Sequence, residues 1–155
     1  MALLHRAFAA MILVFAVFGA ASAQERASLE QARSLATQAA EQVKTSGTAS
    51  YDGFMNGLAP WVDRDLYIIV LARDGTILAH GLNKALVGKN LWEAKDPDGV
   101  RFIQEAVRVA DANASGGWYK LKFTHPQTRK IEPKENFAIK VGDVVVVSGF
   151  YPTVN

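Results

Sequence analysis

The sequence predicts an α+β protein, in which an antiparallel sheet of about five strands is covered by a long N-terminal helix and further helical segments. Two observations lead to this fold class. Short, very apolar runs are separated by Gly-centred turn signals at Asp74-Gly75 and Gly142-Asp143, as is typical of antiparallel hairpins. After the helices at the start of the domain, the predicted elements follow the order strand, strand, helix and three more strands.

Residues 1–23 are predicted to be a cleaved secretory signal and are therefore set aside from the fold. Arg6 precedes an uncharged apolar run at residues 7–17, and Ala21-Ser22-Ala23 supplies the small side chains that a signal peptidase requires. A membrane span needs roughly 20 apolar residues, so an uncleaved membrane anchor is the minority alternative. We expect one exported domain at residues 24–155.

Composition narrows the classes of function. Lys and Arg number 17 against 15 Asp and Glu, and the formal net charge of +2 gives no nucleic-acid footprint. The chain has no Cys, which excludes disulfides, thiolate catalysis and thiolate metal sites. The domain must therefore be held together by its hydrophobic core.

The first helix is predicted to begin after Ser28 and to stop at Gly47. Ser28 and Gln31 have the spacing of a capping box, in which each side chain satisfies a free backbone N–H of the other residue. An apolar stripe follows at Leu29, Ala32, Ala36, Ala39, Ala40 and Val43. This Ala-rich face suits close packing on a sheet, although it could also dock on a partner helix.

A shorter helix is predicted at residues 50–58, and the first hairpin follows it. Residues 66–71 are apolar without alternation, which indicates a strand that is covered on both faces. Arg73-Asp74-Gly75 is predicted to form the turn, and residues 76–80 the return strand.

The next helix is predicted to begin at Asp96, as the N-cap residue, with Pro97 in the first helical position. Gly116-Gly117 is predicted to end it. Its apolar face comprises Val100, Ile103, Val107 and Ala110.

Three more strands complete the prediction. Residues 118–124 alternate, with Tyr119, Leu121 and Phe123 on one face and Trp118 on the other. After a turn at residues 125–129, the last hairpin pairs residues 136–141 with residues 144–151. The apolar run at residues 144–147 is predicted to be central, which gives a PAS-like arrangement.

Catalytic and metal-binding patterns are weak. His80 and His125 are the only histidines after the signal, and neither stands in a metal-binding spacing. No nucleophile and base pair can be named, so we expect no enzyme and keep a hydrolase as the least favoured alternative. Asp63 and Asp65 are expected to be solvated loop residues, and no cofactor or metal is predicted.

A small-molecule site is predicted from the placed aromatic and polar side chains. Ligand pockets combine apolar walls with a few hydrogen-bonding groups, and a lysine beside Tyr and His donors suits a carboxylate. Each residue also has a simpler interpretation, because buried aromatic rings fill cores and Lys134 could be a solvated loop cation. The candidates are Tyr67, His80, Trp118, Tyr119 and Lys134.

Seven blocks along the chain resemble the single Cache domain of the second type, which occurs in bacterial extracytoplasmic sensors. They include Asp74-Gly75-Thr76, Gly117-Trp118 and Glu132-Pro133-Lys134. The blocks lie, in the order of the family, at residues 63–67, 74–81, 86–91, 95–99, 117–118, 132–134 and 141–143.

The resemblance implies a periplasmic module that binds a small organic acid in a pocket on its sheet and takes part in signal transduction or chemotaxis. It places Lys134 at the ligand carboxylate, His80 and Tyr67 as hydrogen-bonding groups, and Trp118 as an apolar wall. Family receptors often have Ser-Tyr after the Pro-Lys pair, whereas this chain has Glu135-Asn136, which removes one hydroxyl.

The expected partner is a membrane receptor or sensor kinase, because no second transmembrane helix or output domain follows Tyr151 in this sequence. The domain itself is expected to be a monomer or a weak homodimer. The alternative from another class is a ligand-free interaction or structural module, in which the same aromatic residues are core and the first helix pairs with a receptor or a second copy.

Overall fold

The computed structural model describes residues 25–153, so the predicted signal peptide and the predicted first mature residue, Gln24, lie outside the described residues. Within that range, no helix has the length and apolar character needed to cross a membrane. The helical segments are α1 (Leu29–Ser46), η1 (Gly47–Ser50), α2 (Tyr51–Phe54), η2 (Lys84–Leu86) and α3 (Phe102–Ala112). The strands are β1 (Val62–Asp63), β2 (Leu66–Ala72), β3 (Ile77–His80), β4 (Gly117–Thr124), β5 (Ile131–Val141) and β6 (Val144–Phe150).

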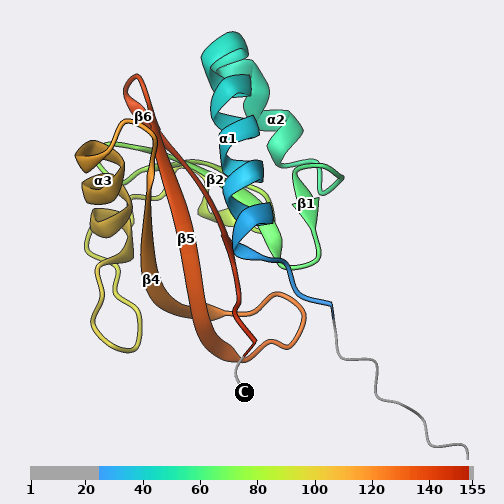
Figure 1. Cartoon of the computed structure of the whole chain (residues 1–155). Coiled ribbons are helices and arrows are strands. Elements are labelled where there is room, and N and C mark those ends of the chain that lie inside the picture. Colours follow the sequence, from blue (N-terminus) through green and yellow to red (C-terminus); the bar gives the residue numbers. More distant parts are fainter. Residues whose placement is uncertain (1–24, 154–155) are drawn as a thin grey trace, which may run out of the picture.

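The strands form an antiparallel sheet in the order β1-β2-β6-β5-β4, and β3 also pairs with β2. The helices α1 and α3 lie on opposite sides of this sheet (Figure 1). The predicted α+β, PAS-like fold with a long N-terminal helix is therefore confirmed, and the two-residue β1 is an addition to the predicted strands. The central position predicted for residues 144–147 is also confirmed, because β6 lies between β2 and β5.

Each face of the sheet buries its own hydrophobic core. On the α1 side, the fully buried Ala32, Ala36 and Ala39 let the helix approach β5 and β6 closely. On the α3 side, the apolar face of α3 packs on β4, β5 and β6 through Ile103, Ala106, Val107, Val109 and Ala110. Because both faces are covered, β2 is apolar without alternation, as the sequence predicts.

The capping box predicted at the start of α1 is present. The Ser28 hydroxyl accepts a hydrogen bond from the Gln31 N–H at 3.2 Å, and the Gln31 side chain accepts one from the Ser28 N–H at 2.9 Å. The helix ends at Gly47, where φ is 56°. The capping box and the glycine therefore set the two ends of α1 where the sequence predicts them.

The predicted start of the third helix is wrong, because α3 begins at Phe102 rather than after Asp96. The Asp96 carboxylate instead accepts hydrogen bonds from the N–H groups of Asp98 and Val100, and from that of Lys122 in β4. Gly99 lies between these partners at a φ of 84°, which an α-helix cannot contain. The helix also ends at Ala112, and Gly117 already belongs to β4.

Two other boundaries differ from the prediction. The helix predicted at residues 50–58 stops at Phe54, and Gly57 beyond it has a φ of 77°. The strand β5 begins at Ile131, five residues before the predicted strand start at Asn136, and pairs with β4 from its first residue. Lys134 therefore lies inside a strand instead of in a loop.

Asp65 joins three separate parts of the chain. Its side chain is fully buried, and it accepts hydrogen bonds from the N–H of Ala27 at 2.7 Å and from that of Tyr151 at 3.0 Å. Ala27 leads into α1, Asp65 leads into β2, and Tyr151 follows β6. The expectation that Asp65 is a solvated loop residue is therefore wrong, because its carboxylate replaces water as the partner of two buried backbone donors.

The substitution Asp65→Asn should lower the free energy of unfolding by roughly 1.5–3 kcal/mol, because an amide can accept only one of these bonds and sets its NH2 against the second donor. Asp63→Asn is the matched control. Asp63 is exposed and pairs with Arg64 at the surface, so its loss should cost less than about 1 kcal/mol. Urea unfolding of the three proteins measures both values, and equal losses would contradict the role given to Asp65.

Candidate functional site

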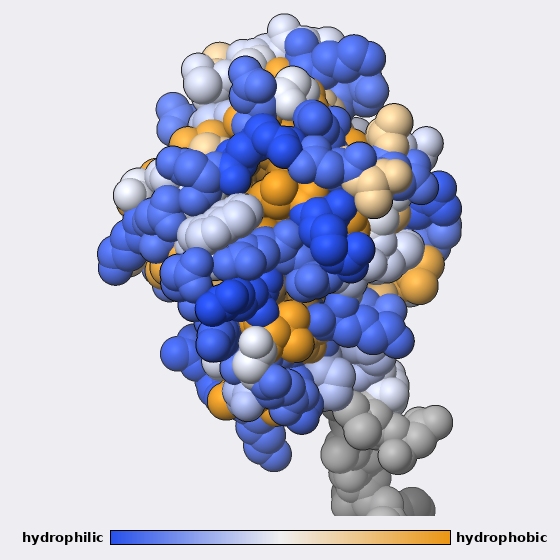
Figure 2. Space-filling model, turned by 90° about the vertical axis from the view of Figure 1, so that its left-hand side faces the viewer, coloured by the Kyte–Doolittle hydropathy of each residue, from blue (hydrophilic) through white to orange (hydrophobic). Residues whose placement is uncertain are grey.

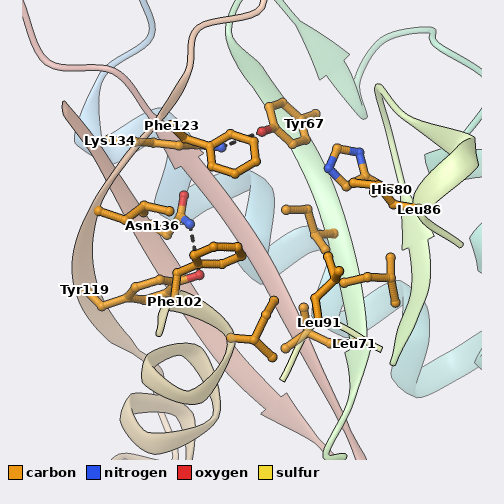
Figure 3. Close-up of a pocket in the computed structure, with 14 residues that line it drawn as sticks. Tyr67, Leu71, His80, Leu86, Leu91, Phe102, Tyr119, Phe123, Lys134 and Asn136 are labelled. Atoms are coloured by element: carbon orange, nitrogen blue, oxygen red, sulfur yellow. Dashed lines mark hydrogen bonds between the residues drawn. The ribbon is translucent and has the colours of Figure 1, made fainter. Parts of the chain in front are cut away.

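A cavity lies on the α3 side of the sheet (Figure 3). Its volume is about 40 Å³, which is room for about three water molecules. Its walls are mainly apolar, with a few polar groups on one side. The lining residues are Tyr67, Ile69, Leu71, Ile77, His80, Leu86, Leu91, Phe102, Ile103, Tyr119, Leu121, Phe123, Lys134 and Asn136.

Strand alternation explains which side chains reach the cavity. Every second residue of a strand points to the same face, so β2 contributes residues 67, 69 and 71, and β4 contributes residues 119, 121 and 123. The antiparallel register then sets Leu121 opposite Lys134, and Tyr119 opposite Asn136. The polar side of the cavity is thus built by neighbouring positions of β4 and β5.

Lys134 is the central polar residue of the cavity. Its side chain belongs to a residue that is only 2% exposed, and its Nζ donates a hydrogen bond to the Tyr67 hydroxyl at 2.7 Å. The Nζ also lies 4.0 Å from the centre of the Tyr67 ring and 5.1 Å from that of Tyr151. None of the ion pairs formed within residues 25–153 includes Lys134. Its ammonium is therefore buried without a neutralising carboxylate, which is an energetically costly arrangement.

His80 lies beside this ammonium as a neutral ring. The His80 ring stacks on Tyr67 with 5.1 Å between ring centres, and its Nδ1 accepts hydrogen bonds from the N–H groups of Leu82 and Asn83. Burial, and then the positive charge of Lys134, lower the pKa of His80 to about 4. Because Nδ1 is an acceptor, the neutral ring carries its proton on Nε2, which is free to donate to a molecule in the cavity.

A second polar pair lies further along β5. The Asn136 Nδ2 donates a hydrogen bond to the Tyr119 hydroxyl at 2.9 Å (Figure 3). Burial raises the pKa of Tyr119 well above its ordinary value, so its phenol stays protonated. The two polar groups are otherwise surrounded by apolar side chains of the cavity.

The cavity lies behind a larger hollow at the surface. The two share Tyr67, His80, Leu86 and Phe123, and the hollow continues between residues 82–83 and the turn that contains Pro126 and Arg129. Figure 2 shows this side of the molecule, where apolar side chains are visible through small gaps in a mainly hydrophilic surface. Leu86 and Phe123 line both spaces, so they lie where the cavity and the hollow meet.

The structure places four of the predicted residues, Tyr67, His80, Tyr119 and Lys134, in the cavity. Trp118, the fifth predicted residue, does not line this cavity. Its ring lies on the α1 side of the sheet, where it packs 5.0 Å from the Phe137 ring and 6.0 Å from the Phe150 ring. Adjacent residues of a strand point to opposite faces, so Trp118 and Tyr119 cannot both line one cavity.

Sequence reasoning missed Asn136 and most of the apolar wall. The spacing of two from Lys134 to Asn136 was the available signal, because both then face the same side of β5. Leu86, Leu91 and Phe102 come from segments without periodicity, so their sequence carried no comparable signal. Among the described residues, no group of three or more His, Asp or Glu side chains is placed to hold a metal ion.

Comparison with known families decides the identity of this fold. The family model named Single Cache domain 2 matches residues 9–153. The chain belongs to the single Cache domain 2 family. The resemblance drawn from the sequence is thereby confirmed, and members of this family are extracytoplasmic sensor modules rather than a class of enzymes.

One curated relative of this Cache domain is the sensor histidine kinase MctS of Rhizobium johnstonii. The two are 32% identical over 78 residues, which make up 50% of this chain and 16% of the kinase. The Cache domain thus spans only a small part of that relative's length.

Solved structures share the Cache fold. A methyl-accepting chemotaxis protein from Vibrio parahaemolyticus superimposes with a TM-score of 0.67 at 20% identity, over 79% of this chain and 86% of the other. A Cache chemosensory domain described for carboxylic acid recognition superimposes with a TM-score of 0.61 at 16% identity, over 78% and 86% of the two chains.

The low pKa of His80 predicts a pH dependence of stability. Between about pH 6.5 and pH 4 the unfolded chain binds a proton at this residue that the folded protein does not, so stability falls as the pH is lowered through this range. The contribution of His80 should be roughly 3 kcal/mol, fully present above pH 6.5.

Urea unfolding at several pH values measures this contribution by comparison with His80→Asn, whose amide oxygen can still accept the N–H groups of Leu82 and Asn83. Burial also lowers the pKa of His125, which adds to the slope in both proteins and cancels in their difference. Parallel stability curves for wild type and His80→Asn would rule out a buried neutral His80.

Proposed function

We propose that this Cache domain binds a small carboxylate in the cavity, with the Lys134 ammonium as the partner of the carboxylate. The single observation that carries this proposal is a buried ammonium that pairs with no carboxylate of the described chain. Burying such a charge costs free energy unless an anion neutralises it, and a bound carboxylate would do so.

The surroundings of Lys134 support an anion more than a neutral ligand. Tyr67 fixes the position of the ammonium, and the His80 Nε2–H is a second donor close by. Hydrogen bonds between an ammonium and a carboxylate are stronger than those between neutral groups. The remaining walls are aliphatic and aromatic, and the cavity is small, so the acid should have a short carbon chain.

We propose binding without chemistry. The described residues that line the cavity include no serine, threonine or carboxylate, and His80 is kept neutral with its Nδ1 already engaged. Among the described residues, the cavity therefore lacks the serine or threonine nucleophile beside a base that a hydrolase of that type needs. The bound state itself is then the signal.

The proposal also includes where the domain acts and which class of protein detects it. Export through the predicted signal at residues 1–23 would deliver it to the periplasm, where a membrane receptor or sensor kinase could detect the loaded form. The similarity to part of a sensor histidine kinase supports a partner of this class. We propose that the domain acts as a monomer or a weak homodimer.

Lys134→Met should weaken binding of a short organic acid by about 10- to 150-fold, because it removes a charge-assisted hydrogen bond. Lys120→Met is the matched control, since Lys120 is an exposed residue of β4 that pairs with Glu135. Calorimetry with the best acid from a panel of two to five carbons gives the three affinities. Unchanged affinity in Lys134→Met, or no binding of any acid to wild type, would overturn the proposal.

The same substitution should leave the empty protein as stable as wild type, or make it more stable. Methionine fills the space of the lysine stem and removes the desolvated charge. Thermal unfolding should therefore show that the acid stabilises wild type but not Lys134→Met. A large loss of stability in the empty variant would assign Lys134 to the structural core instead.

A further inference from the structure

We infer that Asn136 makes the cavity selective for a hydroxy acid, by accepting a hydrogen bond from a hydroxyl group beside the ligand carboxylate. This inference rests on the proposed carboxylate site at Lys134 and names the class of acid. It arises from a polar atom that the protein itself leaves without a partner.

The Asn136 amide is buried, and only one of its two polar atoms has a hydrogen-bond partner. The residue is 3% exposed, its Nδ2 donates to the Tyr119 hydroxyl at 2.9 Å, and its Oδ1 has no hydrogen-bond partner in the described structure. Buried polar atoms are nearly always paired, so an unpaired carbonyl oxygen in the wall of a cavity indicates a missing partner.

The direction of the amide places this oxygen near the proposed anion site. In Figure 3 the Asn136 nitrogen faces Tyr119, and the oxygen faces the side of Lys134. Lys134 and Asn136 are two residues apart on β5, and a strand rises by about 3.3 Å per residue. The oxygen and the ammonium therefore belong to neighbouring positions on the same face of β5, and both residues line the cavity.

The neighbouring strand is shaped to admit this amide. Gly149 of β6 is the register partner of Asn136, and a Cβ added at Gly149 would lie 1.8 Å from Oδ1 and 2.6 Å from the Glu135 carbonyl oxygen. Any larger residue at position 149 would force the Asn136 side chain out of its position. Gly149 thus leaves the space that the side chain of Asn136, a lining residue of the cavity, occupies.

Chemistry selects the group that this oxygen can bind. A carbonyl oxygen is an acceptor only, so it needs a donor from the ligand. A hydroxyl supplies one, an alkyl carbon leaves the oxygen unpaired, and a keto oxygen opposes it. An amino group would also donate, but its positive charge would lie close to the Lys134 ammonium and be repelled. The cavity has room for an acid of about three carbons.

Calorimetry with three acids that share one carbon skeleton tests the inference: propanoate, 2-oxopropanoate and each enantiomer of 2-hydroxypropanoate. Wild type should bind one enantiomer of the hydroxy acid about tenfold or more tightly than propanoate, which is the effect of one buried hydrogen bond. Asn136→Leu has a similar shape without the amide, and it should remove this preference while it retains the affinity for propanoate.

Two further variants keep the test decisive. Tyr119→Phe removes only the hydroxyl that orients the amide, and it should also reduce the preference, even if Asn136→Leu fails to fold. Ser148→Ala is the matched control. Its Oγ is also buried without a hydrogen-bond partner, but Ser148 does not line the cavity and shares its face of β6 with Val146 and Phe150 of the α1-side core, so this variant should retain the wild-type preference.

The outcomes separate the inference from the proposal on which it rests. Equal binding of propanoate and 2-hydroxypropanoate by wild type, a preference for 2-oxopropanoate, or an unchanged preference in both Asn136→Leu and Tyr119→Phe would overturn the role of Asn136 and leave the carboxylate site standing. If none of the acids binds wild type, the carboxylate site itself fails.

Discussion

The buried ammonium of Lys134 is the constraint on which the functional interpretation depends. The sheet holds this charge among the rings of Tyr67, Phe123 and Tyr151, with one phenol as its hydrogen-bond partner and no carboxylate of the described chain to neutralise it. Such an arrangement stabilises nothing by itself, because the desolvation of the charge exceeds what aromatic contacts and one hydrogen bond return. In the proposed function, a carboxylate that enters the cavity neutralises this charge.

The two faces of the sheet have different roles. On the α1 face, alanines and aliphatic residues pack closely against the sheet and hold it in place. The α3 face keeps a space over β2, β4 and β5. Asp65 links the two regions, because it binds the backbone of Ala27 before α1 and of Tyr151, whose ring lies 5.1 Å from the Lys134 Nζ. The Lys134 ammonium therefore lies beside a residue whose backbone Asp65 holds in place.

Sequence alone predicted the fold well, because its main signals are local. The capping box at Ser28, the Asp74-Gly75 turn and the apolar runs each act over a few residues. The burial of Lys134 could not be predicted from such local signals. Pro133 suggests a break, yet β5 continues through it, because this part of β5 pairs only with β4 and its pairing with β6 starts at Glu135. The failure at Asp96 has a similar cause, since its partner Lys122 is distant in sequence.

A crystal structure of the domain grown with propanoate or 2-hydroxypropanoate tests the central claim most directly. We expect the acid in the α3-side cavity, with a carboxylate oxygen about 2.7–2.9 Å from the Lys134 Nζ, as in charge-assisted hydrogen bonds. The His80 Nε2 should lie within hydrogen-bonding distance of the same carboxylate. An acid bound elsewhere, or a Lys134 ammonium that pairs with a carboxylate of the protein while the cavity stays closed, would contradict it.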